Sequence, residues 1–255
     1  MVPPALRRRP FTARTLPVFL LVAVLFGGAT LTGCTPSATL GAGQVPVAEP
    51  QQHVLAGALH ERTAASLIVR DAASRVEVRL SDLPGLLYRI TTPADSGLAP
   101  VVTGTPGRVR LGLRPTGADG PDTVMITLNS GVRWDLRLPA GAGEQHLDLA
   151  AGRLRRLEVG SGTGLVSLRL PPPRGTVPIM LAGGMGRVAI ITPALTPLRF
   201  RLRGGAGSIA VPGAVRVGAQ PGTMIIPAGW RRAIDRYAVD VAAEIGTVTL
   251  ETPNG

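Results

Sequence analysis

Hydrophobic and polar residues alternate in short runs along most of the chain. In GLVSLRLP, residues 164–171, Val166, Leu168 and Leu170 share one face, and the residues between them take the other. Alternation with a period of two is the pattern of a strand with one buried face. The 33 glycines and 24 prolines interrupt helices and favour short strands joined by turns. We therefore expect an all-β fold.

The alternating runs repeat. Six of them begin at a glycine, have Val or Ile near the start, and most end at a proline: Gly107, Gly131, Gly164, Gly186, Gly207 and Gly246. From Gly164 the next two intervals are 22 and 21 residues, and the following one is 39, close to two periods. A period of about 20 residues predicts a β-solenoid, in which stacked repeats bury a shared core. We expect the glycines to turn corners with positive φ and the prolines to end strands.

The predicted solenoid is a single domain over residues 53–253, regular in 131–253 and less regular in 53–130. In the less regular part we expect strands near residues 66–70, 75–80, 86–92, 108–114 and 123–129. Two short helical pieces are also expected, a cap at the start of 53–69 and one turn at 231–237.

Four segments carry a resemblance to known domains: WDLRLP, then HLDLAAGRLRRLEVGSGTGLVSLRLP, then IMLAGGMGRVAIITP, then GW followed by VDVAAEIGTVTLE. Over roughly residues 60–253 their rhythm resembles the bacterial “putative adhesin” domains and the related toast-rack domains of envelope-stress proteins. The resemblance implies a β-solenoid at the cell envelope. It implies no catalytic residues.

The N-terminal residues have the layout of an export signal. Residues 1–14 carry four arginines and no acid, and an apolar run with small residues follows. Leu31-Thr32-Gly33-Cys34 resembles the lipobox of bacterial lipoproteins, which implies a diacylglycerol on Cys34 and cleavage just before it. We therefore expect a signal peptide over 1–33, a lipidated Cys34 with a tether over 34–52, and anchorage at the outer face of the cell membrane.

Alternatives remain for this segment. The 18 uncharged residues 16–33 are near the lower limit for a helix that spans a bilayer, so an uncleaved anchor is one alternative. A buried core thiol at Cys34 is another. Arg8-Arg9-Pro10-Phe11 resembles a twin-arginine signal, so both that export route and the general secretory route stay open.

Composition adds three constraints. The sequence has one cysteine, so it forms no internal disulfide. Aromatic residues make up 3%, so the core must be aliphatic. All 27 basic residues are arginine, which with abundant Ala, Gly, Pro and Val suggests a GC-rich, perhaps actinobacterial, genome. Loss of residues 1–33 would lower the formal net charge from +11 to +7.

Groups for catalysis or metal binding are sparse. His146 and Asp148 share a strand face, with Glu158 expected on a neighbouring strand, but the 16 acids are scattered. The glycines of GSGTG, residues 160–164, precede a strand, whereas a phosphate loop needs a helix there. A calcium-binding repeat would need acids where Val188 and Ile209 stand. We expect no enzyme activity, no cofactor and no metal.

The outward arginines are the one feature with functional potential. If they stack on adjacent turns, they form a basic face that binds phosphates or carboxylates bidentately. The candidate anion-binding face is Arg108, Arg110, Arg169, Arg187, Arg199, Arg201 and Arg203. The alternative is that these arginines only solubilise the protein. No aromatic residues interleave with them, so nucleic acid is not an expected partner.

These features predict a non-enzymatic lipoprotein of the cell envelope whose β-solenoid binds an anionic envelope polymer or a membrane protein. A regulatory sensor of envelope stress that binds a membrane protein is the alternative. An enzyme acting on envelope glycans is the least supported hypothesis.

Overall fold

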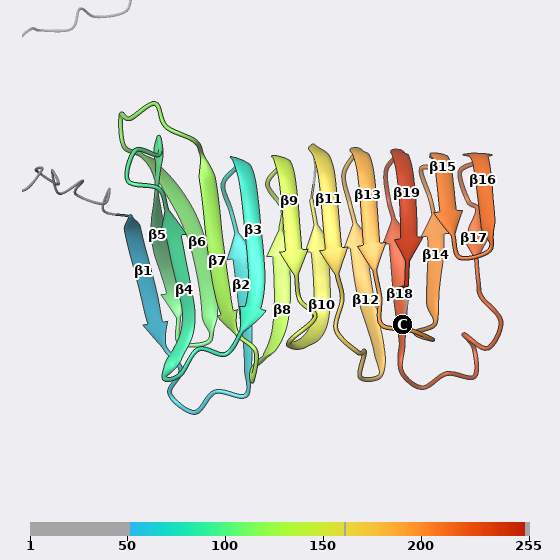
Figure 1. Cartoon of the computed structure of the whole chain (residues 1–255), viewed down its shortest axis with the longest axis horizontal. Helices are drawn as coiled ribbons and strands as arrows, with labels where there is room; N and C mark the ends of the chain where they lie inside the picture. Colours follow the sequence, from blue (N-terminus) through green and yellow to red (C-terminus); the bar gives the residue numbers. More distant parts are fainter. Residues whose placement is uncertain (1–51, 161, 253–255) are drawn as a thin grey trace, which may run out of the picture. The chain divides into compact units, whose positions relative to one another are not determined.

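The computed structural model describes residues 52–160 and 162–252 (Figure 1). Cys34, the predicted signal peptide and all but the last residue of the predicted tether lie outside this part of the chain. The described residues form 19 strands joined by turns, and no helix occurs among them. The all-β prediction is confirmed.

The strands form two sheets. The ten-stranded sheet has the order β1 (His53–Ala58), β4 (Leu86–Thr92), β7 (Thr123–Asn129), β3 (Ala73–Ser81), β9 (Ala142–Asp148), β11 (Thr163–Arg169), β13 (Met185–Ile191), β19 (Ile245–Glu251), β15 (Ala206–Val211) and β16 (Ala214–Ala219). The nine-stranded sheet has the order β17 (Met224–Ile225), β14 (Leu198–Leu202), β18 (Arg236–Val241), β12 (Thr176–Leu181), β10 (Arg153–Val159), β8 (Arg133–Leu138), β2 (Ala64–Val69), β6 (Arg108–Pro115) and β5 (Leu98–Thr105).

The chain winds as a flattened coil in its central part. It passes from β8 to β9, from β10 to β11 and from β12 to β13, one strand in each sheet, and each strand is parallel to the equivalent strand of the next turn. We call such a pair of strands a rung. Val166 aligns with Val188 of the next rung and Gln145 of the previous one. The β-solenoid-like architecture and the period near 20 residues are therefore confirmed.

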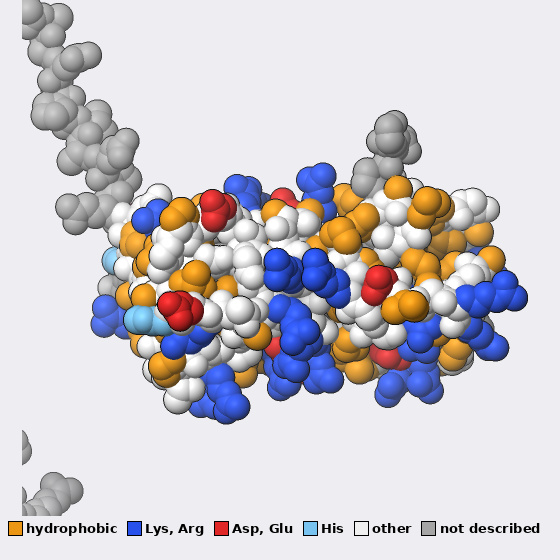
Figure 2. All heavy atoms as spheres, turned by 90° about the horizontal axis from the view of Figure 1, so that it is seen from below, with side chains coloured by type: hydrophobic (Ala, Val, Ile, Leu, Met, Phe, Trp, Pro, Cys, Tyr) orange, Lys and Arg blue, Asp and Glu red, His pale blue; other side chains and the backbone are white. Residues whose placement is uncertain are grey.

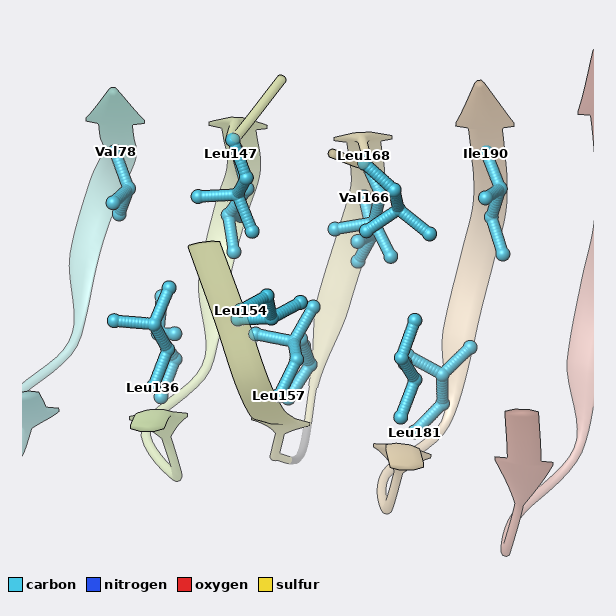
Figure 3. Close-up of a cluster of buried hydrophobic side chains, with 14 of the residues drawn as sticks. Val78, Leu136, Leu147, Leu154, Leu157, Val166, Leu168, Leu181 and Ile190 are labelled. Carbon is cyan, nitrogen blue, oxygen red and sulfur yellow. The ribbon is translucent and has the colours of Figure 1, made fainter. Parts of the chain in front are cut away.

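The core lies between the two sheets and is built from aliphatic side chains. In Figure 3, Leu147, Leu168 and Ile190 of the ten-stranded sheet lie opposite Leu136 and Leu157 of the nine-stranded sheet, and none of the five is more than 1% exposed. Burying such a side chain stabilises the fold by roughly 1.5–3 kcal/mol. The period-two pattern of the sequence correctly predicts which residues point inward.

The rungs do not stack in chain order. The last rung, β18–β19, lies between β12–β13 and β14–β15, and it pairs in parallel with both (Figure 1). At the other end, β2 and β3 lie between β6–β7 and β8–β9. The 39-residue interval before Gly246 therefore holds β16, β17 and a loop. The rung that follows it fills a gap left earlier in the stack.

Tyr237 fastens the inserted rung. Its side chain is fully buried, and its hydroxyl donates a hydrogen bond to the carbonyl oxygen of Pro171 at 2.6 Å, in the turn between β11 and β12. Burial raises the pKa of this hydroxyl, so it stays a neutral donor. Trp230 Nε1 donates to the Tyr237 carbonyl at 2.9 Å and holds the preceding loop against the same strand.

A column of glycines runs across the ten-stranded sheet. It comprises Gly143, Gly164, Gly186, Gly246 and Gly207, each the second residue of its strand. A Cβ on Gly186 would lie 2.7 Å from the carbonyl oxygen of Gly164, and a Cβ on Gly164 would lie 2.8 Å from that of Gly143. Real Cβ atoms do not approach a backbone oxygen so closely, so each position excludes a side chain.

This column corrects one prediction. Of the six glycines that open the repeats, only Gly107 has a positive φ, at 79°. The glycines in the column are needed for the close approach of neighbouring backbones, and the positive φ values lie at other turn residues, such as Gly162 and Gly205.

The glycine column coincides with a repeated bulge. In β11, two outward positions, Gly164 and Leu165, separate the buried Thr163 and Val166, where regular alternation would allow one. The strands β3, β9, β13, β15 and β19 begin with the same pattern. Each bulge reverses the alternation once, so every rung aims the same positions at the core.

The remaining local predictions divide clearly. All five strands expected between residues 66 and 129 are present as β2, β3, β4, β6 and β7. The helical cap at 53–69 is wrong, because the segment holds β1 and β2. The helical turn expected at 231–237 is misplaced: one turn closes from Ala233 N to Gly229 O at 3.0 Å, and β18 begins at Arg236.

Replacing Gly186 with alanine should destabilise the fold by about 1–3 kcal/mol, because the new methyl group meets the Gly164 carbonyl. Gly184→Ala is the matched control: its Cβ would lie 3.9 Å from the nearest listed-distance atom, Glu244 O, and should change stability by about 0.5 kcal/mol or less. Urea unfolding measures both. Equal effects of the two substitutions would contradict the role given to the glycine column.

Tyr237→Phe should destabilise the fold by about 1–3 kcal/mol, because it leaves the buried Pro171 carbonyl without its donor. Thermal unfolding measures the loss. Tyr88→Phe is a suitable comparison, since Tyr88 is only half-buried at the other end of the stack and should have a smaller effect. A Tyr237→Phe protein as stable as the wild type would show that packing alone holds the inserted rung.

Candidate functional site

The seven arginines of the predicted anion-binding face do not form one face. Arg108 and Arg110 lie on β6, whereas Arg199 and Arg201 lie on β14, and five strands of the nine-stranded sheet separate β6 from β14. Two others, Arg169 on β11 and Arg187 on β13, belong to the ten-stranded sheet on the opposite side of the core. The seventh, Arg203, follows β14 at a corner. The structure thus separates residues that the sequence pattern grouped together.

Part of this set has internal partners. Arg199 Nη2 lies 3.7 Å from Asp240 Oδ2, and its guanidinium carbon lies 4.8 Å from the centroid of the Trp230 ring. Arg236 packs against the same ring at 4.2 Å, and Arg203 Nη2 lies 4.0 Å from Asp240 Oδ1. Arg199 therefore fixes the Trp230 loop to the stack, a structural role that ligand binding would disturb.

The middle of the nine-stranded sheet holds a second charged group. Asp135 points to the outer face, yet its side chain is only 7% exposed because arginines cover it. Arg155 Nη2 forms a close ion pair with its Oδ2, and Arg137 Nε lies 3.6 Å from its Oδ1. Arg137 also lies 3.9 Å from Glu158. The acids of this region therefore neutralise Arg137 and Arg155.

Three arginines that the sequence analysis did not single out come together at the edge where the chain passes from the ten-stranded to the nine-stranded sheet. Arg133 begins β8, Arg153 begins β10, and Arg174 lies two residues before β12. All three are exposed, and they line one hollow of about 340 Å³. We call them the arginine corner. Figure 2, viewed from below, shows basic side chains gathered across the middle of this edge.

A sequence signal for the arginine corner exists. The three arginines are spaced by 20 and 21 residues, the period of the repeat itself. Each stands beside a turn: Arg133 and Arg153 open their strands, and Arg174 precedes Gly175. A search for alternation within strands passes over such positions, whereas a search for one residue type at the repeat period finds them.

The catalytic cluster considered from the sequence is not assembled. His146 and Asp148 lie on β9 and line a shallow groove on the ten-stranded sheet, but Glu158 lies on β10 in the other sheet, so that part of the expectation is wrong. His146 Nε2 instead lies 3.0 Å from Glu144 Oε2. This hydrogen bond, together with the nearby Arg75 charge, holds the pKa of Glu144 below its usual range.

Two general properties of the described residues bear on function. Within 52–160 and 162–252, no group of three or more His, Cys, Asp or Glu side chains is placed to hold a metal ion. The same part of the chain contains no helix with the length and apolarity needed to cross a bilayer.

Comparison with known proteins identifies the type of domain. Residues 113–191 match the family model described as “N-terminal domain of toast_rack, DUF2154”. The chain thus carries a toast-rack-like domain, a domain of unknown function, as the sequence rhythm predicted. No curated protein matches the chain.

A solved structure shares the fold. It is titled a “putative cell adhesion protein” from Clostridium sporogenes ATCC 15579, and it is similar to this chain with a TM-score of 0.59 and 15% sequence identity. The match covers 80% of this chain and 100% of that chain. At this identity the similarity concerns the fold.

Replacing Asp135 with asparagine should destabilise the fold by about 1–3 kcal/mol, because it removes the charge that organises Arg155 and Arg137 over a buried position. Glu158→Gln is the control, since this exposed acid should contribute about 0–1 kcal/mol. Urea unfolding of both proteins measures the difference. If both substitutions cost the same, the Asp135 cluster is no more than a surface ion pair.

Proposed function

We propose that this protein uses its toast-rack-like domain as a non-enzymatic binding module, held at the outer face of the cell membrane by a lipid on Cys34. The observation that carries the proposal is the regular stack of rungs, which repeats outward side chains at the spacing of neighbouring strands, about 4.8 Å. Such a surface suits an extended ligand with repeated groups better than a single small substrate. The proposal adopts binding as the role of the domain.

The N-terminal sequence supplies the proposed membrane attachment. After cleavage before Cys34, residues 34–52 would connect the lipid to the first strand, and 19 residues span at most about 65 Å. The remaining chain would carry a net charge of +7 near anionic headgroups and wall polymers. Both features favour an anionic envelope polymer as the partner.

A second candidate function is the binding of a membrane protein, as an envelope-stress sensor would need. It is favoured by β16, the terminal strand of the ten-stranded sheet. Val215 and Val217 on this strand are 71% and 85% exposed. A terminal strand with exposed apolar residues is a place where a strand of another protein can pair. Val217→Lys should abolish capture of such a partner and leave polymer binding unchanged.

The lipid attachment is tested by intact mass and fractionation of the native protein beside a Cys34→Ala variant. We expect the wild type to lose residues 1–33, to gain the mass of a lipid and to sediment with membranes. The variant should lack the lipid mass and keep its signal segment. If residues 1–33 remain in both proteins, the segment is an uncleaved anchor and the lipoprotein proposal is wrong.

A further inference from the structure

The arginine corner has the arrangement of an anion-binding site. Arg133 and Arg153 are direct partners across β8 and β10, and Arg174 lies at the start of the next strand, β12. Neighbouring strands are about 4.8 Å apart, so three guanidinium groups are carried at that spacing along one edge. The rigid rungs fix where the three side chains begin, so a ligand need not organise the backbone.

The arginine corner also lacks counter-charges of its own. Among the described residues, no carboxylate lies within 4.0 Å of Arg133, Arg153 or Arg174, whereas Arg137 and Arg155 on the adjacent face are paired with acids. Two like charges about 5 Å apart repel by roughly 0.8 kcal/mol even in water. A bound anion would remove this repulsion, and a dianion would do so for two guanidinium groups at once.

The hollow between the three arginines gives a ligand room to enter. Its floor is formed by small or rigid turn residues, Gly131, Ala151, Gly152 and Pro172, with Ser130 and Leu154 beside them. Because none of these carries a negative charge or a long side chain, the three guanidinium groups can converge on one occupant. Each turn contributes its own small residues and its own arginine.

We propose that the arginine corner binds phosphate groups, which names the ligand chemistry of the proposed binding function and rests on it. A guanidinium fork forms two parallel hydrogen bonds with an oxyanion. One fork occupies both oxygens of a carboxylate. A phosphate has further oxygens on its other faces, so one group can bridge guanidinium forks on two successive rungs. The repeated spacing therefore favours phosphate over carboxylate.

Calorimetric titration of the full-length protein in detergent with inorganic tripolyphosphate tests the site. The triple variant Arg133→Gln, Arg153→Gln, Arg174→Gln should bind at least about tenfold more weakly than the wild type. The matched control is Arg108→Gln, Arg110→Gln, Arg201→Gln, which removes the same charge from exposed positions of the same sheet and should weaken binding by less than about threefold. Unchanged thermal unfolding of both variants confirms that the fold is intact.

Two outcomes would overturn the site. One is the absence of tripolyphosphate binding by the wild type at 0.15 M salt, and the other is an equal loss in both triple variants, which would show that net charge alone attracts the anion. Neither outcome affects the Cys34 mass and fractionation result, so failure of the site and failure of the lipoprotein proposal are distinguishable. Replacing the three corner arginines with lysine should also weaken binding, because the charge remains but the fork is lost.

Vesicles distinguish the two sources of phosphate. The non-lipidated Cys34→Ala protein is mixed with neutral phosphatidylcholine vesicles and with vesicles that also contain phosphatidic acid. If the corner variant loses both tripolyphosphate and phosphatidic acid binding, the site accepts lipid headgroups. If it loses tripolyphosphate binding while vesicle binding matches the wild type, the site takes phosphate groups of a non-lipid ligand. Both results support the site and identify its source of phosphate.

Discussion

The close approach of neighbouring backbones along the glycine column is the constraint on which the regular rungs depend. At Gly164 and Gly186 a carbonyl oxygen occupies the space that a side chain would need, so the strands can pair there only without a Cβ. The same position carries the bulge that places two outward residues in succession. Every rung therefore changes its alternation at the same height, and the aliphatic residues after the bulge meet across the core. A rung with an unmatched bulge would turn its core residues towards solvent.

The sequence predicted the strands and the core well, because period-two alternation reports directly on which side chains are buried. It did not reveal why glycine recurs. Glycine serves both where φ is positive, as at Gly162, and where a Cβ has no room, as at Gly186, and the sequence is the same in both cases. The order of the rungs was hidden for a similar reason. All rungs share one pattern, so only specific contacts such as Tyr237 with Pro171 show which of them are neighbours.

The candidate site shows the same limit in another form. Alternation correctly placed Arg108 and Arg201 on an outer surface, but their distance depends on the strand order, and that order separates their strands widely. The arginine corner escapes this uncertainty. Its members lie on consecutive rungs β8, β10 and β12, where chain order and spatial order agree, so the repeat period alone brings them together. Periodic spacing is therefore a stronger guide to a shared surface than outward orientation in this fold.

The architecture itself separates the roles of its arginines. On the flat face of the nine-stranded sheet, Arg137 and Arg155 are tied to Asp135, and at the end of the stack Arg199 is tied to Asp240 and Trp230. At the turns, residues are small and no acid reaches the guanidinium groups of the arginine corner among the described residues. Catalysis needs unlike groups that converge in one pocket, whereas a stack of similar rungs multiplies one group along a line. Several weak contacts to a repeated ligand add their effects without any new chemistry, and this is the kind of work that the fold is built to do.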